Sequence, residues 1–248
     1  MDTQVLKTAV LLACRAPSVH NSQPWLWVAE GQVLRLYVDR HLTVPGTDHS
    51  GREAIISCGA VLDHLCVAML AGGWHAGIER FPNPNDPDHL ASIEFSSVEH
   101  VTEAQRERAT AILRRRTDRL PLRRPTSWDS FEPALRSAID NSLVTIHVLS
   151  DDARPKLAEA SQLAEAIRRD DWLYQSELDL WTSPFVISEG VPPSALASEK
   201  EDIRVDVGRW FPARSRLDRR PEVKADWSKI LVLSTAEDTN ADALRSGE

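Results

Sequence analysis

The strongest constraint on the fold is a long apolar segment that runs from about residue 50 to residue 73. It starts with the sequence SGRE, the spacing of a helix capping box, in which a Ser hydroxyl and a Glu carboxylate each accept a hydrogen bond from a backbone amide. Nearly every turn as far as Leu70 carries Ala, Ile, Val, Leu or Met, and Gly72 and Gly73 then favour a left-handed helix end. Because a helix that is apolar on most sides must be covered on most sides, we expect a central, buried helix.

The remaining periodic segments predict helices and strands around this helix. Helical spacing of apolar residues, with a second capping box at Thr102 and Gln105, predicts helices over residues 3–14, 103–115, 129–140 and 154–180. Runs rich in β-formers predict strands over residues 25–29, 33–38, 74–81, 90–95, 144–149 and 230–234. The first two form a hairpin, and the next two pair across a Pro-rich linker that cannot be regular structure. The predicted fold class is α+β, with helices around a mainly antiparallel sheet.

Residues 184–226 form the longest stretch without a periodic pattern. The stretch is rich in Pro, Arg, Ser and acidic residues, with Trp210 and Phe211 among them. A structureless segment of this length in a compact domain is usually a lid, a binding arm or a disordered segment. No Pro- or Gly-rich linker divides the chain convincingly, so we predict a single domain over residues 1–248, with 184–226 as a candidate lid.

The composition argues against several classes of protein. The 248 residues include 29 Lys and Arg against 37 Asp and Glu, a net charge of 29 − 37 = −8, which argues against a broad nucleic-acid-binding face. We expect no apolar run to approach the roughly 18 residues of a membrane span, and no signal peptide, since an acid stands at position 2. The odd cysteine number without a CxxC pair indicates reduced thiols and a cytoplasmic location. Dispersed His residues predict no metal site.

The first candidate site is the loop of residues 16–25, with the sequence APSVHNSQPW. It concentrates Ser, His, Asn and Gln side chains between two prolines, and Trp25 can anchor it in the core. Backbone amides and short polar side chains in such a loop can bind the carbonyl and ring nitrogen atoms of a flat heterocycle. The alternative is a proline-stiffened turn that satisfies its own backbone.

The second candidate site is the basic cluster of residues 114–119, with the sequence RRRTDR. Arg115 and Arg119 lie four residues apart, so they share a face if the preceding helix continues. Guanidinium groups match phosphate oxygens, and Thr117 adds a hydroxyl. The alternative is a solvated helix end, where the helix dipole favours positive charge.

Other common site motifs are absent from the sequence. The chain contains neither GxGxxG nor GxxxxGK followed by Ser or Thr, so a Rossmann or P-loop nucleotide site is not predicted. It also lacks GxSxG, which leaves α/β-hydrolase chemistry without support.

Both candidate sites resemble motifs of one known family. Residues 16–25 resemble the APSxxNxQPWxF loop of the FMN-dependent nitroreductases, and RRTDR at 115–119 resembles their RRSxR phosphate motif. Two further stretches, TDHSGREA at 47–54 with CGAVL at 58–62, and RFPNPNDP at 80–87, are similar to the mycobacterial Acg-type branch of that superfamily. The resemblance extends over essentially the whole chain.

The resemblance implies a nitroreductase-like α+β fold that holds FMN at an interface between two similar halves. The Acg-type branch looks like two such units fused in one chain, here at about 1–100 and about 101–248. The second half would be incomplete, because the final LRSGE weakly echoes HSGRE at 49–53, where the first central helix begins. We therefore expect either a C-terminally truncated fragment or a homodimer that covers exposed apolar surface.

The resemblance also assigns residues to the cofactor. It implies that Pro17, Ser18 and Asn21 line the isoalloxazine, with His20 and Gln23 nearby, and that the FMN phosphate and ribityl oxygens are held by Arg115, Arg116, Thr117 and Arg119. The family's reaction is hydride transfer from NAD(P)H to the flavin, then reduction of a nitroaromatic, quinone or related small molecule. Because the flavin carries this chemistry, no catalytic acid or nucleophile is expected.

Two other functions stay open on the sequence alone. A non-catalytic flavin-binding or flavin-storage protein would use residues 184–226 as a lid that closes the nicotinamide site. An inactive structural remnant would follow from the missing C-terminal unit. Reduction of bound flavin by NAD(P)H argues against the first, and cooperative unfolding of a soluble monomer argues against the second.

Overall fold

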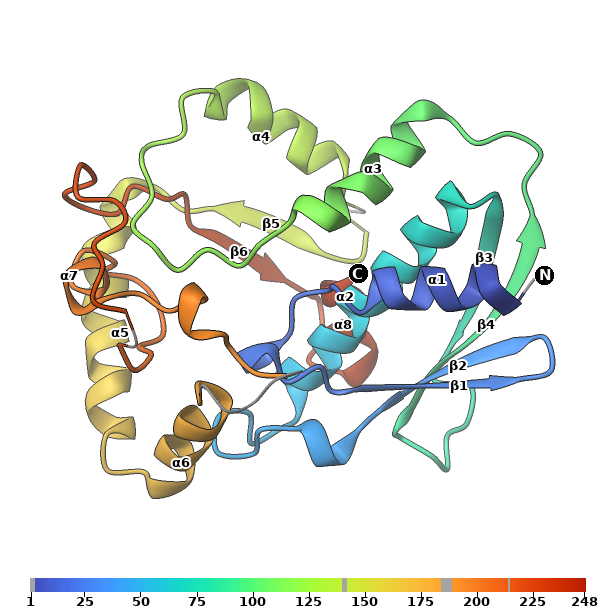
Figure 1. Cartoon of the computed structure of the whole chain (residues 1–248), viewed down its shortest axis with the longest axis horizontal. Helices are drawn as coiled ribbons and strands as arrows, with labels where there is room; N and C mark the ends of the chain where they lie inside the picture. The colour runs from blue at the N-terminus through green and yellow to red at the C-terminus, as the bar shows by residue number, and fades with distance from the viewer. Residues whose placement is uncertain (1–2, 140–141, 184–188, 214) are drawn as a thin grey trace. The chain divides into compact units, whose positions relative to one another are not determined.

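The computed structural model describes residues 3–139, 142–183, 189–213 and 215–248 (Figure 1). The chain divides into two compact units, the first made of Met1–Arg116 and Glu237–Glu248 and the second of Thr117–Ala236. The prediction of one nitroreductase-like domain with two related halves stays a prediction.

The first unit contains a four-stranded antiparallel sheet. Its strands are β1 (Trp25–Glu30), β2 (Val33–Val38), β3 (Trp74–Arg80) and β4 (His89–Ser97), in the spatial order β1-β2-β4-β3. Gly31 in the β1–β2 turn has a φ of 61°, in the left-handed region that glycine adopts without strain. The predicted hairpin and the predicted pairing of the next two strands are both confirmed.

One helix lies at the centre of this unit, as predicted. This helix, α2 (Arg52–Ala71), contacts α1 (Thr3–Ala13), α3 (Glu103–Arg114) and α8 (Asn240–Gly247) as well as strands β2 and β3 (Figure 1). Cys58, Val61, Leu62, Leu65 and Met69 on α2 are fully buried. A core residue cluster that includes members of α1, α2, α8 and the sheet therefore forms around α2.

The central helix has the length and composition of a membrane span. By these two criteria α2 is long and apolar enough to cross a membrane, so the expectation that no apolar run approaches this length was wrong. More than half of its apolar stretch is buried inside the structure, as in the core helix of a globular protein. The match is therefore weak evidence for a membrane segment.

The predicted capping box at the start of α2 was also wrong. The N-cap is Gly51, with a φ of 74°, and its position makes no side-chain cap. The carboxylate of Asp48 accepts a hydrogen bond from the Ala54 amide at 2.9 Å instead, while the Ser50 hydroxyl accepts one from the Arg52 amide at 3.3 Å. The capping box predicted at Thr102 is confirmed. The Thr102 hydroxyl accepts a hydrogen bond from the Gln105 amide, and the Gln105 side chain accepts one from the Thr102 amide at the start of α3.

The second unit contains one two-stranded antiparallel sheet and four helices among its described residues. The strands are β5 (Thr145–Val148) and β6 (Leu231–Ser234), and the helices are α4 (Trp128–Ser137), α5 (Arg154–Arg168), α6 (Trp172–Trp181) and α7 (Glu199–Asp202). The single helix predicted over residues 154–180 is two helices. Asp171 interrupts it, because its carboxylate accepts hydrogen bonds from Leu173 and Tyr174 and begins α6.

Apart from the short helix α7 and a 3-10 turn at Pro193–Ala195, the described part of residues 184–226 is irregular, as predicted, and several ion pairs hold it in place. Arg219 donates to Glu201 at 3.0 Å and to the Leu196 carbonyl at 2.5 Å, and Arg204 donates to Asp218 at 2.6 Å. Burial alone would raise the pKa of Glu201, but the hydrogen bonds from Arg219 and Ser198 outweigh it and lower the pKa to about 2. Residues 184–188 and 214 of the candidate lid lie outside the described residues.

The backbones of α2 and α8 approach each other closely at two glycines. A Cβ added at Gly59 would lie 2.0 Å from the carbonyl oxygen of Leu244, and one added at Gly247 would lie 2.0 Å from that of Ile56. No side chain larger than hydrogen fits at either position without a shift of backbone. Helix α8 thus forms part of the core around α2, since Ala243 and Leu244 are fully buried.

Replacing Gly59 with alanine should therefore destabilise the protein, although alanine is favoured over glycine in a helix by about 1 kcal/mol. Forcing a methyl group into a packed backbone contact costs about 1–3 kcal/mol. We expect a lower urea midpoint for Gly59→Ala. Gly77→Ala is the control, because its nearest neighbour would be 3.8 Å away. A midpoint of Gly59→Ala equal to that of the wild type would contradict the close approach.

Candidate functional site

The loop between α1 and β1 has an unusual backbone. His20, Asn21 and Gln23 have φ values of 50°, 55° and 53°. Side chains other than glycine are disfavoured in this region, at about 1–3 kcal/mol each when strained. Strain of this kind persists only where the surrounding structure enforces it, and it is concentrated at binding and catalytic sites. The loop chosen from its polar composition is therefore also the most strained part of the described backbone.

Side chains of α2 and its preceding loop hold this strained loop in place. The Val19 amide donates to the Ser57 hydroxyl at 3.1 Å, and the Cys58 thiol donates to the Pro24 carbonyl at 3.2 Å. The His20 ring nitrogen Nε2 lies 3.1 Å from the hydroxyl of Thr47, and both side chains are buried. Burial raises the pKa of the Cys58 thiol, so it remains a neutral donor.

The predicted site residues of the loop divide by exposure. Pro17 is exposed and Ser18, Asn21 and Gln23 are partly exposed, so these side chains can reach a ligand. His20 is buried against Thr47, which gives it a role in fixing the loop rather than in lining its surface.

A buried hydroxyl in the loop provides a test of whether the loop fits a polar ligand. Among the residues that the structure describes, the Ser22 hydroxyl is buried without a hydrogen-bond partner. An unsatisfied buried hydroxyl is unfavourable by about 1–3 kcal/mol. The donors and acceptors that a ligand can reach are those of the partly exposed Ser18, Asn21 and Gln23, and they fit the polar edge of a flat heterocycle such as an isoalloxazine.

The structure brings one predicted phosphate residue to the start of this loop. Arg115 donates to the carbonyl oxygen of Arg15 at 2.9 Å, and Arg15 donates to that of Leu113 at 3.3 Å. Burial, followed by the positive charges of Arg15 and Arg116, lowers the pKa of Arg115. Like charges held together in this way favour an anion between them.

Arg115 and Arg119 do not share a helical face, because the helix does not continue past Arg114. Helix α3 ends at Arg114, and Arg115 is its C-cap with a ψ of 136°, so the chain leaves the helix there. Arg116 donates to the carbonyl oxygens of Leu113 and Arg115 and so caps the helix end. This contact is the helix-end interpretation that the sequence left open for the basic cluster.

Thr117 and Arg119 belong to the second unit. The Arg119 guanidinium lies over the ring of Phe211, with its Cζ 4.8 Å from the ring centroid. Burial lowers the pKa of Arg119, and the intervening Asp118 pairs with Arg220 at 2.5 Å. Arg119 is therefore partly buried beside an aromatic ring rather than beside a carboxylate.

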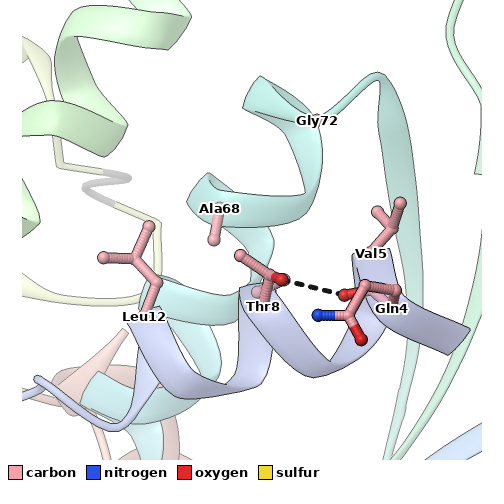
Figure 2. Close-up of a pocket in the computed structure, with 7 residues that line it drawn as sticks. Gln4, Val5, Thr8, Leu12, Ala68 and Gly72 are labelled. Atoms are coloured by element: carbon pink, nitrogen blue, oxygen red, sulfur yellow. Dashed lines mark hydrogen bonds between the residues drawn. The ribbon is translucent and has the colours of Figure 1, made fainter.

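Two grooves of the described structure lie away from these residues. One of about 280 Å³ lies between α1 and α2 and is lined mainly by apolar side chains, among them Val5, Leu12 and Ala68 (Figure 2). Another, of about 380 Å³, is lined by residues that include Ser198 and Arg216. None of the predicted site residues lines either groove. Within the described ranges, no group of three or more His, Cys, Asp or Glu could hold a metal ion.

Comparison with known proteins identifies the family. No protein-family model matches the chain. It is 62% identical to "Uncharacterized protein Rv3127" of Mycobacterium tuberculosis over 248 residues, which is 98% of this chain and 72% of that protein. It is 55% identical to "Putative NAD(P)H nitroreductase acg" of the same species, over 100% of this chain and 75% of that protein. The chain belongs to the Acg-type branch of the nitroreductase family.

A more distant relative agrees with this assignment. "Putative NAD(P)H nitroreductase Rv3131" of Mycobacterium tuberculosis is 34% identical over 254 residues, which span 100% of this chain and 71% of that protein. The α+β fold with a mainly antiparallel sheet is compatible with a nitroreductase-like fold.

Sequence reasoning missed the residues that hold the nitroreductase motifs in place. Ser57 and Cys58 anchor the loop from a distance of more than thirty residues in the sequence, and Phe211 stacks on Arg119 from within the irregular stretch. No local pattern marks Ser57 as an anchor. The one available signal was its place in the first turns of a helix predicted to be central.

Replacing Ser57 with alanine should loosen the strained loop. The Val19 amide would lose its acceptor, and a lost hydrogen bond of this kind lowers the free energy of unfolding by about 1 kcal/mol. We expect this loss in urea unfolding and faster hydrogen exchange of the Val19 amide. Thr8→Ala is the control, because that exposed hydroxyl donates only to the Gln4 carbonyl of its own helix (Figure 2). Unchanged exchange at Val19 would show that the Ser57 contact does not hold the loop.

Proposed function

We propose that this chain is an FMN-binding oxidoreductase that accepts hydride from NAD(P)H and passes it to a nitroaromatic or quinone acceptor. The observation that carries the proposal is the strained polar loop of residues 17–23. It is held against α2 on one side and begins beside Arg115 on the other. The printed names of two relatives, which describe NAD(P)H nitroreductases, support the same chemistry.

The proposed FMN contacts fall into two groups. Ser18, Asn21 and Gln23 would bind the polar edge of the isoalloxazine and Pro17 would pack against it, while buried His20 would keep the loop in its strained form. Arg115, Arg116, Thr117 and Arg119 would hold the phosphate and ribityl oxygens. Arginine suits this role because its planar donors match two phosphate oxygens at once.

The work of the protein in this reaction is binding and orientation. Bound FMN would supply the hydride chemistry, as flavins do in general. The strained loop would fix the orientation of the ring system, and the charges of Arg15 and Arg115 would offset the phosphate. No side chain is proposed as a catalytic acid or nucleophile.

Several finer expectations belong to this proposal. We expect a small-molecule acceptor, no nucleic-acid or membrane partner, and a homodimer in the cytoplasm. The alternative of a flavin-storage protein predicts that NAD(P)H leaves the bound flavin oxidised, so the rate of flavin reduction separates the two. The ion pairs of Arg204 and Arg219 fix much of the described part of the candidate lid, which favours the enzyme.

Arg115→Gln should weaken FMN binding about 10- to 100-fold, since a hydrogen bond to a charged group is worth about 1.5–3 kcal/mol. The measurement is a titration of apoprotein with FMN, followed by flavin absorbance. Arg106→Gln is the matched control, because Arg106 lies on α3, the helix that ends just before Arg115, is exposed and pairs with Glu103.

The wild-type protein should be yellow, or become so with added FMN, and should oxidise NAD(P)H when a nitroaromatic acceptor is present. A colourless protein that cannot be reconstituted with FMN would overturn the proposed function. If Arg115→Gln and Arg106→Gln bind FMN with equal affinity, Arg115 does not contact the cofactor.

A further inference from the structure

Arg119 contacts an aromatic ring, whereas several other arginines of the second unit form ion pairs. Within the described part of the second unit, Arg119 has no carboxylate within ion-pair distance, and its contact is the ring of Phe211 at 4.8 Å. By contrast, four other arginines of the same unit each pair with a carboxylate: Arg154, Arg204, Arg219 and Arg220. Arg119 therefore has unused hydrogen-bonding capacity where those side chains have little.

The acid next to Arg119 in the sequence is occupied elsewhere. The Asp118 carboxylate accepts a bond from Arg220 at 2.5 Å and another from the Leu120 amide at 3.0 Å. Asp118 thus neutralises Arg220 rather than Arg119. The pairing matters because a carboxylate on Arg119 would occupy the donors that a phosphate needs.

Stacking on an aromatic ring orients a guanidinium without using its donors. The attraction acts through the face of the guanidinium, whereas its five N–H groups lie in the guanidinium plane and point outward from its edge. A stacked arginine is therefore directed and still able to bind an anion with two parallel hydrogen bonds. The arrangement leaves a positive charge partly buried, which is unfavourable, and an anionic ligand would offset this cost.

The segments that carry the two side chains are both fixed within the second unit. After Arg119, the Leu122 amide donates to Asp226 at 2.8 Å, and the Leu122 carbonyl accepts from the Trp227 amide at 2.8 Å. Before Phe211, Asp206 pairs with Arg154 on α5 at 2.6 Å. The chain is thus held three residues after Arg119 and five residues before Phe211.

We infer that Phe211 is a positioning residue that holds Arg119 ready for the flavin phosphate and thereby sets a preference for FMN over riboflavin. This inference rests on the proposed function, because it concerns how the same cofactor is selected. If Phe211 has this role, the irregular stretch that contains it contributes to selectivity for FMN. Neither the sequence motifs nor the names of the relatives assign it this role.

The test compares flavin affinities of the full-length apoprotein and three variants, with FMN and riboflavin titrated separately by fluorescence. In Phe211→Leu we expect the Kd for FMN to rise about 3- to 30-fold, the range of a lost cation–π contact, while the Kd for riboflavin stays unchanged. Phe211→Tyr keeps the ring face and should bind FMN within about twofold of the wild type. Phe211→Met, which keeps a long apolar side chain, replaces the Leu variant if that variant loses its circular dichroism spectrum.

Three results would overturn the inference while leaving the proposed function intact. The first is an unchanged affinity of Phe211→Leu for FMN. The second is an equal loss of affinity of Phe211→Leu for FMN and for riboflavin. The third is a loss of FMN affinity in Phe211→Tyr as large as in Phe211→Leu. If riboflavin binds the wild type too weakly to titrate, the difference in FMN affinity between Phe211→Leu and Phe211→Tyr tests the inference. A wild-type apoprotein that binds no FMN would overturn the proposed function and this inference with it.

Discussion

The burial of α2 is the constraint on which the first unit depends. A helix that is apolar on most sides needs partners on most sides, and these come from distant parts of the chain: α1 near the start, α8 at the end, and strands β2 and β3. The approach of α8 is so close that Gly59 and Gly247 leave no space for a side chain. Because the first turns of α2 carry Ser57 and Cys58, the same packing also determines where the candidate flavin loop lies.

The hydrogen bonds that anchor this loop offset part of its backbone strain. Three residues in the left-handed region are together unfavourable by several kcal/mol, since each contributes about 1–3 kcal/mol. The hydrogen bonds from Val19 and to Pro24 offset part of this, at about 1 kcal/mol each. On this account the loop is preorganised at the expense of stability, as is common at sites that bind rigid ligands.

The sequence predicted most helices and strands because their signals are local. Apolar periodicity, the Thr102 capping box and the turn at Gly31 all act within a few residues, and the structure confirms them. The errors arose where a group outside the predicted motif made the deciding hydrogen bond. At the start of α2, the Ser50 hydroxyl accepts from the Arg52 amide and forms no capping box with Glu53, and Asp48 accepts from the Ala54 amide. The anchoring by Ser57 and the stacking by Phe211 depend on tertiary contacts that no local pattern carries.

The net charge of −8 argues against a broad nucleic-acid-binding face, yet the candidate phosphate-binding cluster of residues 114–119 is basic. The two observations agree because salt screens exposed charges beyond about 8–10 Å, so a small anion responds to its nearest neighbours and not to the whole chain. What matters locally is which arginines are already neutralised. Arg220 is neutralised by Asp118, whereas Arg119 rests on Phe211 and Arg115 lies beside two further positive charges. Selection of a phosphorylated ligand by an acidic protein therefore depends on the pairing of individual arginines rather than on their number.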